Sequence, residues 1–132
     1  MRPGSNRPAS SPRPKVSLVD DDLSIRESLP SLIAALGFDV EVFASAEDYL
    51  TSAGTTASEI LVLDVAMSGM SGPELHAHLK GLGRVVPVVF ITALRDAAMR
   101  ERLLRHGAVD CLFKPFDDVQ LSDALEEARS HL

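Results

Sequence analysis

The sequence has few residues that crosslink a chain or anchor it in a bilayer. Among its 132 residues there is a single cysteine, Cys111. One cysteine excludes an internal disulfide and a cysteine-rich zinc site, and it is typical of a reducing compartment. No apolar run approaches the roughly 20 residues of a membrane span, and residues 1–14 lack the apolar middle of a signal peptide. These absences predict a cytoplasmic protein that makes no membrane contact.

Basic residues are fewer than acidic ones, 13 against 19, and they are unevenly placed. The formal net charge is -6, yet the first fifteen positions hold no acidic residue. The basic residues of that stretch are Arg2, Arg7, Arg13 and Lys15. So few charges among Pro, Ser and Asn predict a disordered basic leader over residues 1–14 rather than a tail for nucleic acid or membrane. The remainder suits a single domain over residues 15–132, and its acidic character disfavours direct nucleic-acid contact.

Short apolar runs alternate with helix-like segments from residue 15 onward. The runs expected to form strands are 16–19, 40–43, 60–63, 85–91 and 109–113. The stretches Ile-Leu-Val-Leu and Val-Val-Phe-Ile within them are apolar throughout, as expected when a sheet is covered on both faces. Five strand-helix pairs in strict alternation predict an α/β protein with a parallel sheet and right-handed crossovers.

Capping residues mark where the helices begin and end. Three pairs have the spacing of a capping box, namely Ser45 with Asp48, Ser71 with Glu74 and Asp117 with Gln120. Gly37 and Gly107 are expected to end the first and fourth helices, and the fourth should run from about residue 95 to residue 106. Pro30 lies inside the first helix and predicts a kink there.

Polar side chains stand at the carboxyl ends of four predicted strands. They are Asp20, Asp21 and Asp22 after the first strand, Asp64 after the third, Thr92 and Ala93 after the fourth, and Lys114 and Pro115 after the fifth. In an open parallel sheet these ends gather around the crevice at the topological switch point. The sequence therefore predicts carboxylates, one hydroxyl and one ammonium at one rim of the sheet.

This set of groups matches the chemistry of an aspartyl phosphate. Carboxylates packed this closely repel one another unless a cation lies among them, and oxygen ligands without nearby histidine or cysteine favour Mg²⁺ or Mn²⁺ over zinc. Lys114 can pair with Asp64 at rest and with a phosphoryl oxygen later, and Thr92 can donate a hydrogen bond to the same group. Formation of an aspartyl phosphate requires a carboxylate nucleophile and positive charge placed near the phosphoryl oxygens.

The side chains elsewhere that could take part in catalysis or metal binding are interpreted as structural. The four histidines lie on predicted helices away from the acidic rim, so we expect surface roles for His76, His78, His106 and His131. Cys111 is expected to be a small buried packing residue rather than a redox centre.

Four segments of the sequence resemble the receiver domain of two-component response regulators. They are Val-Asp-Asp-Asp followed by Arg26, Leu-Asp-Val-Ala-Met-Ser-Gly-Met-Ser-Gly, Ile-Thr-Ala and Phe-Lys-Pro-Phe, in the family's order and spacing. Val-Phe-Ile-Thr-Ala and Ala-Val-Asp-Cys-Leu-Phe-Lys-Pro-Phe are similar to the subgroup that includes the nitrogen-fixation regulator FixJ. The resemblance implies a flavodoxin-like (βα)5 doubly wound sandwich with a five-stranded parallel sheet in the order 2-1-3-4-5.

The resemblance also implies roles for the residues of the acidic rim. Asp64 is then the phosphoacceptor, and it holds Mg²⁺, for which Mn²⁺ can substitute, together with Asp20 and Asp21. The backbone carbonyl of Ala66 is implied as a further metal ligand. Asp22 is then expected to be a turn and N-cap residue and not a metal ligand, a role that is common for an aspartate just before a helix.

Three further residues receive roles from the same resemblance. Thr92 matches the switch hydroxyl, the backbone N–H of Ala93 reaches the phosphoryl group, and Lys114 matches the family's lysine. The bond between Lys114 and Pro115 is expected to be cis.

The sequence departs from the family pattern at several positions. Ser68 stands where proline is usual, so the loop after Asp64 is expected to be less rigid. Cys111 replaces an aromatic residue that usually moves with the switch threonine. Ala66 and Leu94 offer no polar side chain to orient water, which predicts slow self-dephosphorylation.

The function implied is that of a bacterial cytoplasmic signalling receiver in a two-component phosphorelay. Its partners would be a sensor histidine kinase or phosphotransfer protein and a downstream protein or its own output domain. Phosphorylation would switch the surface of the fourth helix, fifth strand and fifth helix for partner binding or homodimer formation. The chain would catalyse only its own phosphorylation and slow dephosphorylation.

Three alternatives of other classes are weaker. A small Mg²⁺-dependent aspartyl-phosphate phosphatase normally has a second acid where this chain has Ala66. A flavodoxin-like mononucleotide binder needs a phosphate-cradling loop, where this chain has three aspartates. A phosphorylation-independent receiver-fold interaction module does not need the reacting groups that are present here.

Overall fold

The computed structural model describes residues 13–52 and 58–132 and contains a single parallel sheet. Its strands are β1 (Lys15–Val19), β2 (Asp39–Phe43), β3 (Ile60–Asp64), β4 (Val88–Thr92) and β5 (Asp110–Phe113). The helices between and after them are α1 (Leu23–Ala35), α2 (Ala46–Ser52), α3 (Gly72–Gly81), α4 (Ala97–Arg105) and α5 (Asp118–Arg129). All strand pairs are parallel, in the order β2-β1-β3-β4-β5. The predicted α/β doubly wound fold and its strand order are confirmed.

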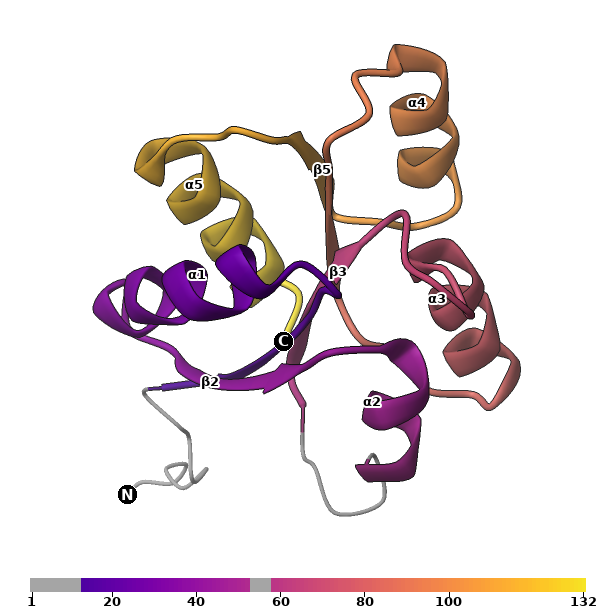
Figure 1. The fold of residues 1–132 in the computed structure, drawn as a ribbon, viewed down its shortest axis with the longest axis horizontal. Coiled ribbons are helices and arrows are strands. Elements are labelled where there is room, and N and C mark those ends of the chain that lie inside the picture. The colour runs from indigo at the N-terminus through magenta and orange to yellow at the C-terminus, as the bar shows by residue number, and fades with distance from the viewer. Residues whose placement is uncertain (1–12, 53–57) are drawn as a thin grey trace.

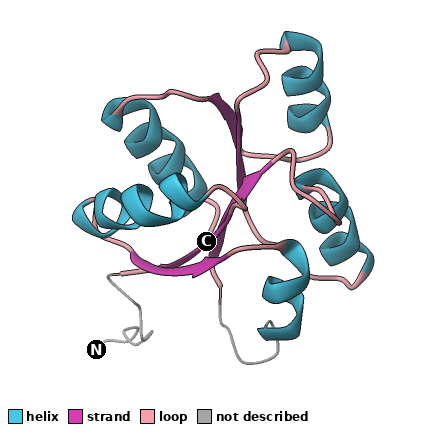
Figure 2. Cartoon of the chain, in the orientation of Figure 1, coloured by secondary structure: helices cyan, strands magenta, loops and turns pink. Residues whose placement is uncertain are grey.

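The helices cover both faces of the sheet. Helices α1 and α5 lie on one face, and α2, α3 and α4 lie on the other (Figure 1). Secondary-structure colouring shows the sheet as the central layer between them (Figure 2). Each face has its own apolar cluster, and β3 contributes alternate residues to both because all five of its residues are buried. The apolar run Ile-Leu-Val-Leu is explained by this double coverage.

Strand β4 begins later than the sequence predicted. It starts at Val88, whereas Val85 is 94% exposed. Pro87 has no N–H to give to a ladder, although its carbonyl still accepts a hydrogen bond from the Leu61 N–H at 2.9 Å. The expected strand at 85–91 is therefore wrong at its first residues, and the error comes from counting apolar residues across a proline.

The predicted helix caps largely agree with the structure. Reciprocal capping boxes join Ser71 with Glu74 and Asp117 with Gln120, and the Asp48 N–H donates to Ser45 Oγ at 3.0 Å. Helix α4 begins at Ala97 after the N-cap Asp96, two residues later than expected. Pro30 lies inside α1, which continues through it as one helix.

His76 is not the surface residue that the sequence predicted. It is 8% exposed, on the inward face of α3, and its ring packs edge-on against Phe90 with centroids 5.8 Å apart. Burial lowers the pKa of His76, and the charges of Lys80 and His106 lower it further. His76 is a neutral packing residue because it faces β4 and not solvent.

Contacts with the sheet begin before the predicted domain boundary. The Arg13 side chain donates to Asp39 at 3.0 Å, and the Pro14 carbonyl accepts the Asp39 N–H at 3.1 Å. The rest of the predicted leader, residues 1–12, lies outside the described residues. Within residues 13–52 and 58–132, no helix combines the length and apolar character needed to cross a bilayer.

Gly72 brings the start of α3 against the end of β3. A Cβ atom at this position would lie 2.2 Å from the backbone oxygen of Asp64 and 3.2 Å from a ring carbon of Phe90. The absence of a side chain therefore sets how closely α3 approaches the last residue of β3.

Replacing Gly72 with alanine should lower the free energy of unfolding by about 1–3 kcal/mol, because the new methyl group meets backbone that cannot yield. Gly81 is the matched control. It lies in the same helix, and a Cβ there meets nothing within 4 Å, so Gly81→Ala should be neutral or stabilise by up to about 1 kcal/mol. Urea unfolding of both variants measures the difference, and equal stabilities would contradict the close approach.

Candidate functional site

Three aspartates converge at the carboxyl ends of β1 and β3. Side-chain oxygens of Asp20, Asp21 and Asp64 lie within 4.8 Å of one another. The first two follow β1 and the third ends β3, and these strands are parallel neighbours. Asp20 is fully buried and Asp64 is 5% exposed, while Asp21 is exposed. The rim predicted from sequence is thus present, with two carboxylates inside and one outside.

Lys114 places one ammonium between the two buried carboxylates. Its Nζ lies 3.0 Å from Asp20 Oδ2 and 3.4 Å from Asp64 Oδ1. The predicted resting pair with Asp64 exists, but the shorter bond goes to Asp20. The Lys114 N–H donates to the Thr92 carbonyl at 2.7 Å, and the bond to Pro115 is cis, as expected.

One ammonium does not offset two buried carboxylates. Burial raises the pKa of Asp64 to about 6, and the negative charge of Asp20 raises it as well, while Lys114 acts in the opposite direction. Burial alone would lower the pKa of Lys114, but its hydrogen bond to Asp20 and the charge of Asp64 bring it above its ordinary value. The site therefore retains unbalanced negative charge near neutral pH.

The donor set fits a hard divalent cation. All the side-chain donors are carboxylate oxygens, and the described residues add no histidine or cysteine to this cluster. The raised pKa of Asp64 is what an added cation would reverse. Ala66, whose carbonyl was the fourth expected ligand, lies two residues after Asp64, in the loop that follows β3, and is exposed.

Thr92 and Ala93 lie at the end of β4, beside Asp64 in the sheet. Thr92 is fully buried, and its hydroxyl oxygen accepts a hydrogen bond from the Leu94 N–H at 3.0 Å. Strand β4 pairs with β3 so that Asp64 is opposite Ile91, one residue before Thr92. Ala93 is exposed at the start of the following loop.

Asp22 caps a helix and takes no place in the carboxylate cluster. Its Oδ1 accepts hydrogen bonds from the N–H and the hydroxyl of Ser24, each at 2.9 Å. The side-chain bond to Ser24 is the main cause of its lowered pKa. The predicted cap role of Asp22 is confirmed.

Arg26 and Glu47 support the site, and sequence reasoning gave neither a role. The Arg26 guanidinium donates to the backbone carbonyl of Asp20 at 3.0 Å. Glu47 Oε2 accepts the Met70 N–H at 2.9 Å, within the loop that follows Asp64. The spacing of Arg26 from Asp20 is a visible signal, because six residues carry the chain from the strand end into the first turns of α1. No local pattern marks Glu47.

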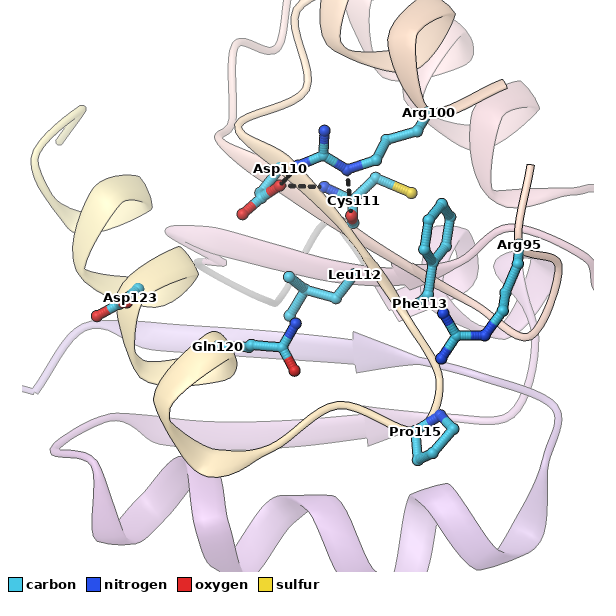
Figure 3. A pocket seen from close by; sticks show the side chains of 9 residues that line it. All are labelled: Arg95, Arg100, Asp110, Cys111, Leu112, Phe113, Pro115, Gln120 and Asp123. Atoms are coloured by element: carbon cyan, nitrogen blue, oxygen red, sulfur yellow. Dashed lines mark hydrogen bonds and ion pairs between the residues drawn. The ribbon is translucent and has the colours of Figure 1, made fainter. Parts of the chain in front are cut away.

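Cys111 is buried, as predicted, in β5 beside a surface crevice. It is 2% exposed, and burial raises the pKa of its thiol to about 11, so the group is a neutral packing side chain. The crevice, of about 360 Å³, lies between α4, β5 and α5 (Figure 3). Arg100 lines it from α4 and donates to Asp110 Oδ1 at 2.7 Å and to the Cys111 carbonyl at 2.9 Å.

Comparison with known proteins gives one consistent family. The family model for the response regulator receiver domain matches residues 16–126. Nodulation protein W of Bradyrhizobium diazoefficiens is 41% identical over 113 residues, which are 86% of this chain and 50% of that protein. The transcriptional regulatory protein FixJ of Rhizobium meliloti is 38% identical over 117 residues, covering 89% of this chain and 57% of that protein.

Solved structures agree with the sequence relatives. The crystal structure of FixJ-N is 37% identical, with a TM-score of 0.82 over 90% of this chain and 95% of that one. The response regulator StyR is 41% identical, with a TM-score of 0.81 over 90% of this chain and 60% of that one. The chain spans about half the length of several of the curated relatives it matches.

The raised pKa of Asp64 predicts a pH-dependent effect of Asp64→Asn in the presence of a chelator. Between its ordinary value of 3.8 and about 6, the folded protein holds a proton that the unfolded chain has lost, so this group lowers stability as pH rises through that window. Above it, ionised Asp64 costs about 1–3 kcal/mol that asparagine avoids. Urea unfolding from pH 4 to 7.5 should show Asp64→Asn gaining stability over the wild type with rising pH. A gain that is independent of pH would contradict the raised pKa of Asp64.

Proposed function

The chain belongs to the response regulator receiver domain family, and we propose from this premise that Asp64 is the residue that accepts the phosphoryl group. The chain is a signalling receiver of two-component systems. The observation that carries the assignment is the position of Asp64, which ends β3 close to Asp20 and has its Oδ1 3.4 Å from the Lys114 ammonium. A carboxylate nucleophile with a fixed positive charge beside it has what phosphoryl transfer requires.

The proposed site would hold Mg²⁺, for which Mn²⁺ can substitute. Its ligands would be the carboxylates of Asp20, Asp21 and Asp64 and the backbone carbonyl of Ala66. When bound, the cation supplies charge that neutralises the oxygens of the transferring group. The four ligands are all oxygens, and three of them come from the acidic cluster. The unbalanced charge at Asp64 supports this set.

Asp64 attacks the phosphorus of a phosphohistidine on a sensor histidine kinase or phosphotransfer protein. A bond forms between its carboxylate oxygen and phosphorus as the bond from phosphorus to the imidazole nitrogen breaks. The imidazole takes the electron pair. Lys114 turns its ammonium from the resting carboxylates to a phosphoryl oxygen, and the Ala93 N–H donates to another.

Thr92 links the phosphoryl group to the rest of the domain. At rest its hydroxyl accepts the Leu94 N–H, and after transfer it donates to a phosphoryl oxygen. This exchange moves the loop before α4 and shifts the population of conformers at the α4-β5-α5 surface, where the crevice of Figure 3 lies. With the small Cys111 in place of an aromatic ring, the change passes through the backbone of α4 and β5.

The shifted surface binds a downstream protein, an output domain of the same regulator, or a second copy of the chain. The domain itself contacts no nucleic acid. It acts on no substrate other than its own phosphoryl group, which it acquires and slowly loses. A phosphatase would use a second acid two residues beyond Asp64, and that position is Ala66.

Incubating the chain with acetyl phosphate and Mg²⁺ should add one phosphoryl group, measured by intact mass. Asp64→Asn should abolish the addition, because an amide is not a nucleophile for phosphorus. Asp22→Asn is the control, since Asp22 caps α1 without joining the cluster, and it should be labelled like the wild type. If Asp64→Asn gained a phosphoryl group at the wild-type stoichiometry, the assignment of Asp64 as the phosphoacceptor would be refuted.

The lifetime of the phosphoryl group should be long, because Ala66 cannot orient an attacking water. Ala66→Asn places a polar amide two residues after Asp64 and should shorten the lifetime severalfold. Ala66→Val keeps the position apolar and should leave the lifetime unchanged. After acetyl phosphate is removed, intact mass measured over time gives the rate at which each of the three proteins loses its phosphoryl group. Fast loss from the wild type, or equal lifetimes in all three proteins, is the contrary result.

A further inference from the structure

The loop between β3 and α3, residues 65–71, carries the Ala66 carbonyl assigned to the cation. Its base is closed by the Gly72 N–H, which donates to the Val65 carbonyl at 3.1 Å. Two N–H groups within the loop donate to carboxylates from distant parts of the chain: Ser68 to Asp21 and Met70 to Glu47. The loop is thus held at three points rather than only at its ends.

Glu47, in the first turn of α2, holds the second half of the loop. Its Oε2 accepts the Met70 N–H at 2.9 Å, and this bond is the main cause of the lowered pKa of Glu47. Gly69 makes room for the carboxylate, because a Cβ there would lie 2.8 Å from the same oxygen. The φ of Gly69 is +75°, a conformation that glycine adopts without strain. The loop and the carboxylate therefore fit each other closely.

Asp21 holds the first half of the loop. Its Oδ2 accepts the Ser68 N–H at 3.2 Å. Proline, which the family pattern places at this position, has no N–H and cannot make this bond. The departure from the pattern therefore adds a contact between the loop and a carboxylate of the acidic cluster. Because a carboxylate has several acceptor positions, Asp21 can bind the loop and a cation together.

We propose that the Ser68 N–H and the Glu47 carboxylate are positioning groups for Mg²⁺, and that they make α2 part of the support of the cation site. They hold the loop so that the Ala66 carbonyl and the Asp21 carboxylate are placed before the cation arrives. Ligands already held lose less conformational entropy on binding. The inference rests on the proposed function, because it takes the cluster of Asp20, Asp21 and Asp64 as the Mg²⁺ site.

Calorimetric titration of the whole chain with Mg²⁺ tests both contacts. Ser68→Pro and Glu47→Ala each remove one bond and should weaken Mg²⁺ binding by about 2–10-fold, the equivalent of one hydrogen bond. Ser68→Ala keeps the backbone N–H and should bind like the wild type. Glu47→Gln keeps an acceptor oxygen without the charge, and its affinity should lie between those of Glu47→Ala and the wild type.

Phosphorylation rates over a range of Mg²⁺ concentrations separate positioning from general damage. At saturating Mg²⁺, Ser68→Pro and Glu47→Ala should reach the wild-type maximum rate, because only affinity has changed. Equal Mg²⁺ affinities for Ser68→Pro and Ser68→Ala, or for Glu47→Ala and the wild type, would overturn the inference, as would lower rates at every Mg²⁺ concentration. A wild-type chain that binds no Mg²⁺ would instead overturn the proposed function, so the two failures are distinguishable.

Discussion

The electrostatic contact among Asp20, Lys114 and Asp64 is the constraint on which the rest of the site depends. Two carboxylates are buried at neighbouring strand ends, and the single ammonium between them lies 3.0 Å from one and 3.4 Å from the other. Such an arrangement costs stability without a further cation, because like charges are held together away from water. A fold selected for stability alone would place apolar residues here, so the strain marks a functional site and supports the proposed binding of a cation and a phosphoryl group.

The parallel sheet produces this contact with little help from local structure. Strands β1 and β3 are direct neighbours, so the residues that end them meet at the same edge. Lys114 comes directly after the edge strand β5, and its ammonium reaches the carboxylates at the ends of β1 and β3 across the position of β4. Thr92 lies at the same edge, and its buried hydroxyl accepts the Leu94 N–H of the loop before α4. This bond connects the surroundings of Asp64 to that loop. The proposed reaction and the proposed conformational response thus share one edge of one sheet.

Local patterns predicted the elements well, because caps and apolar runs depend on neighbours in sequence. The pairs Ser71 with Glu74 and Asp117 with Gln120 are examples, and the polar rim followed from the strand ends once the sheet was known to be parallel. Long-range contacts were not predictable in this way. The burial of His76 against Phe90 and the bond from Ser68 to Asp21 depend on how α3 and its loop approach the sheet. Ser68 was expected to loosen the loop, and the expectation took no account of the N–H that serine has and proline lacks.

A carboxyl-carbon NMR titration of Asp64 in the whole chain measures the unbalanced charge most directly. Without divalent cation, Asp64 should titrate with a pKa of about 6, raised by burial and by Asp20. With saturating Mg²⁺, the same carbon should titrate at distinctly lower pH, because the cation favours the ionised form. A pKa near the ordinary 3.8 that does not move when Mg²⁺ is added would contradict both the unbalanced charge at Asp64 and the proposed cation site.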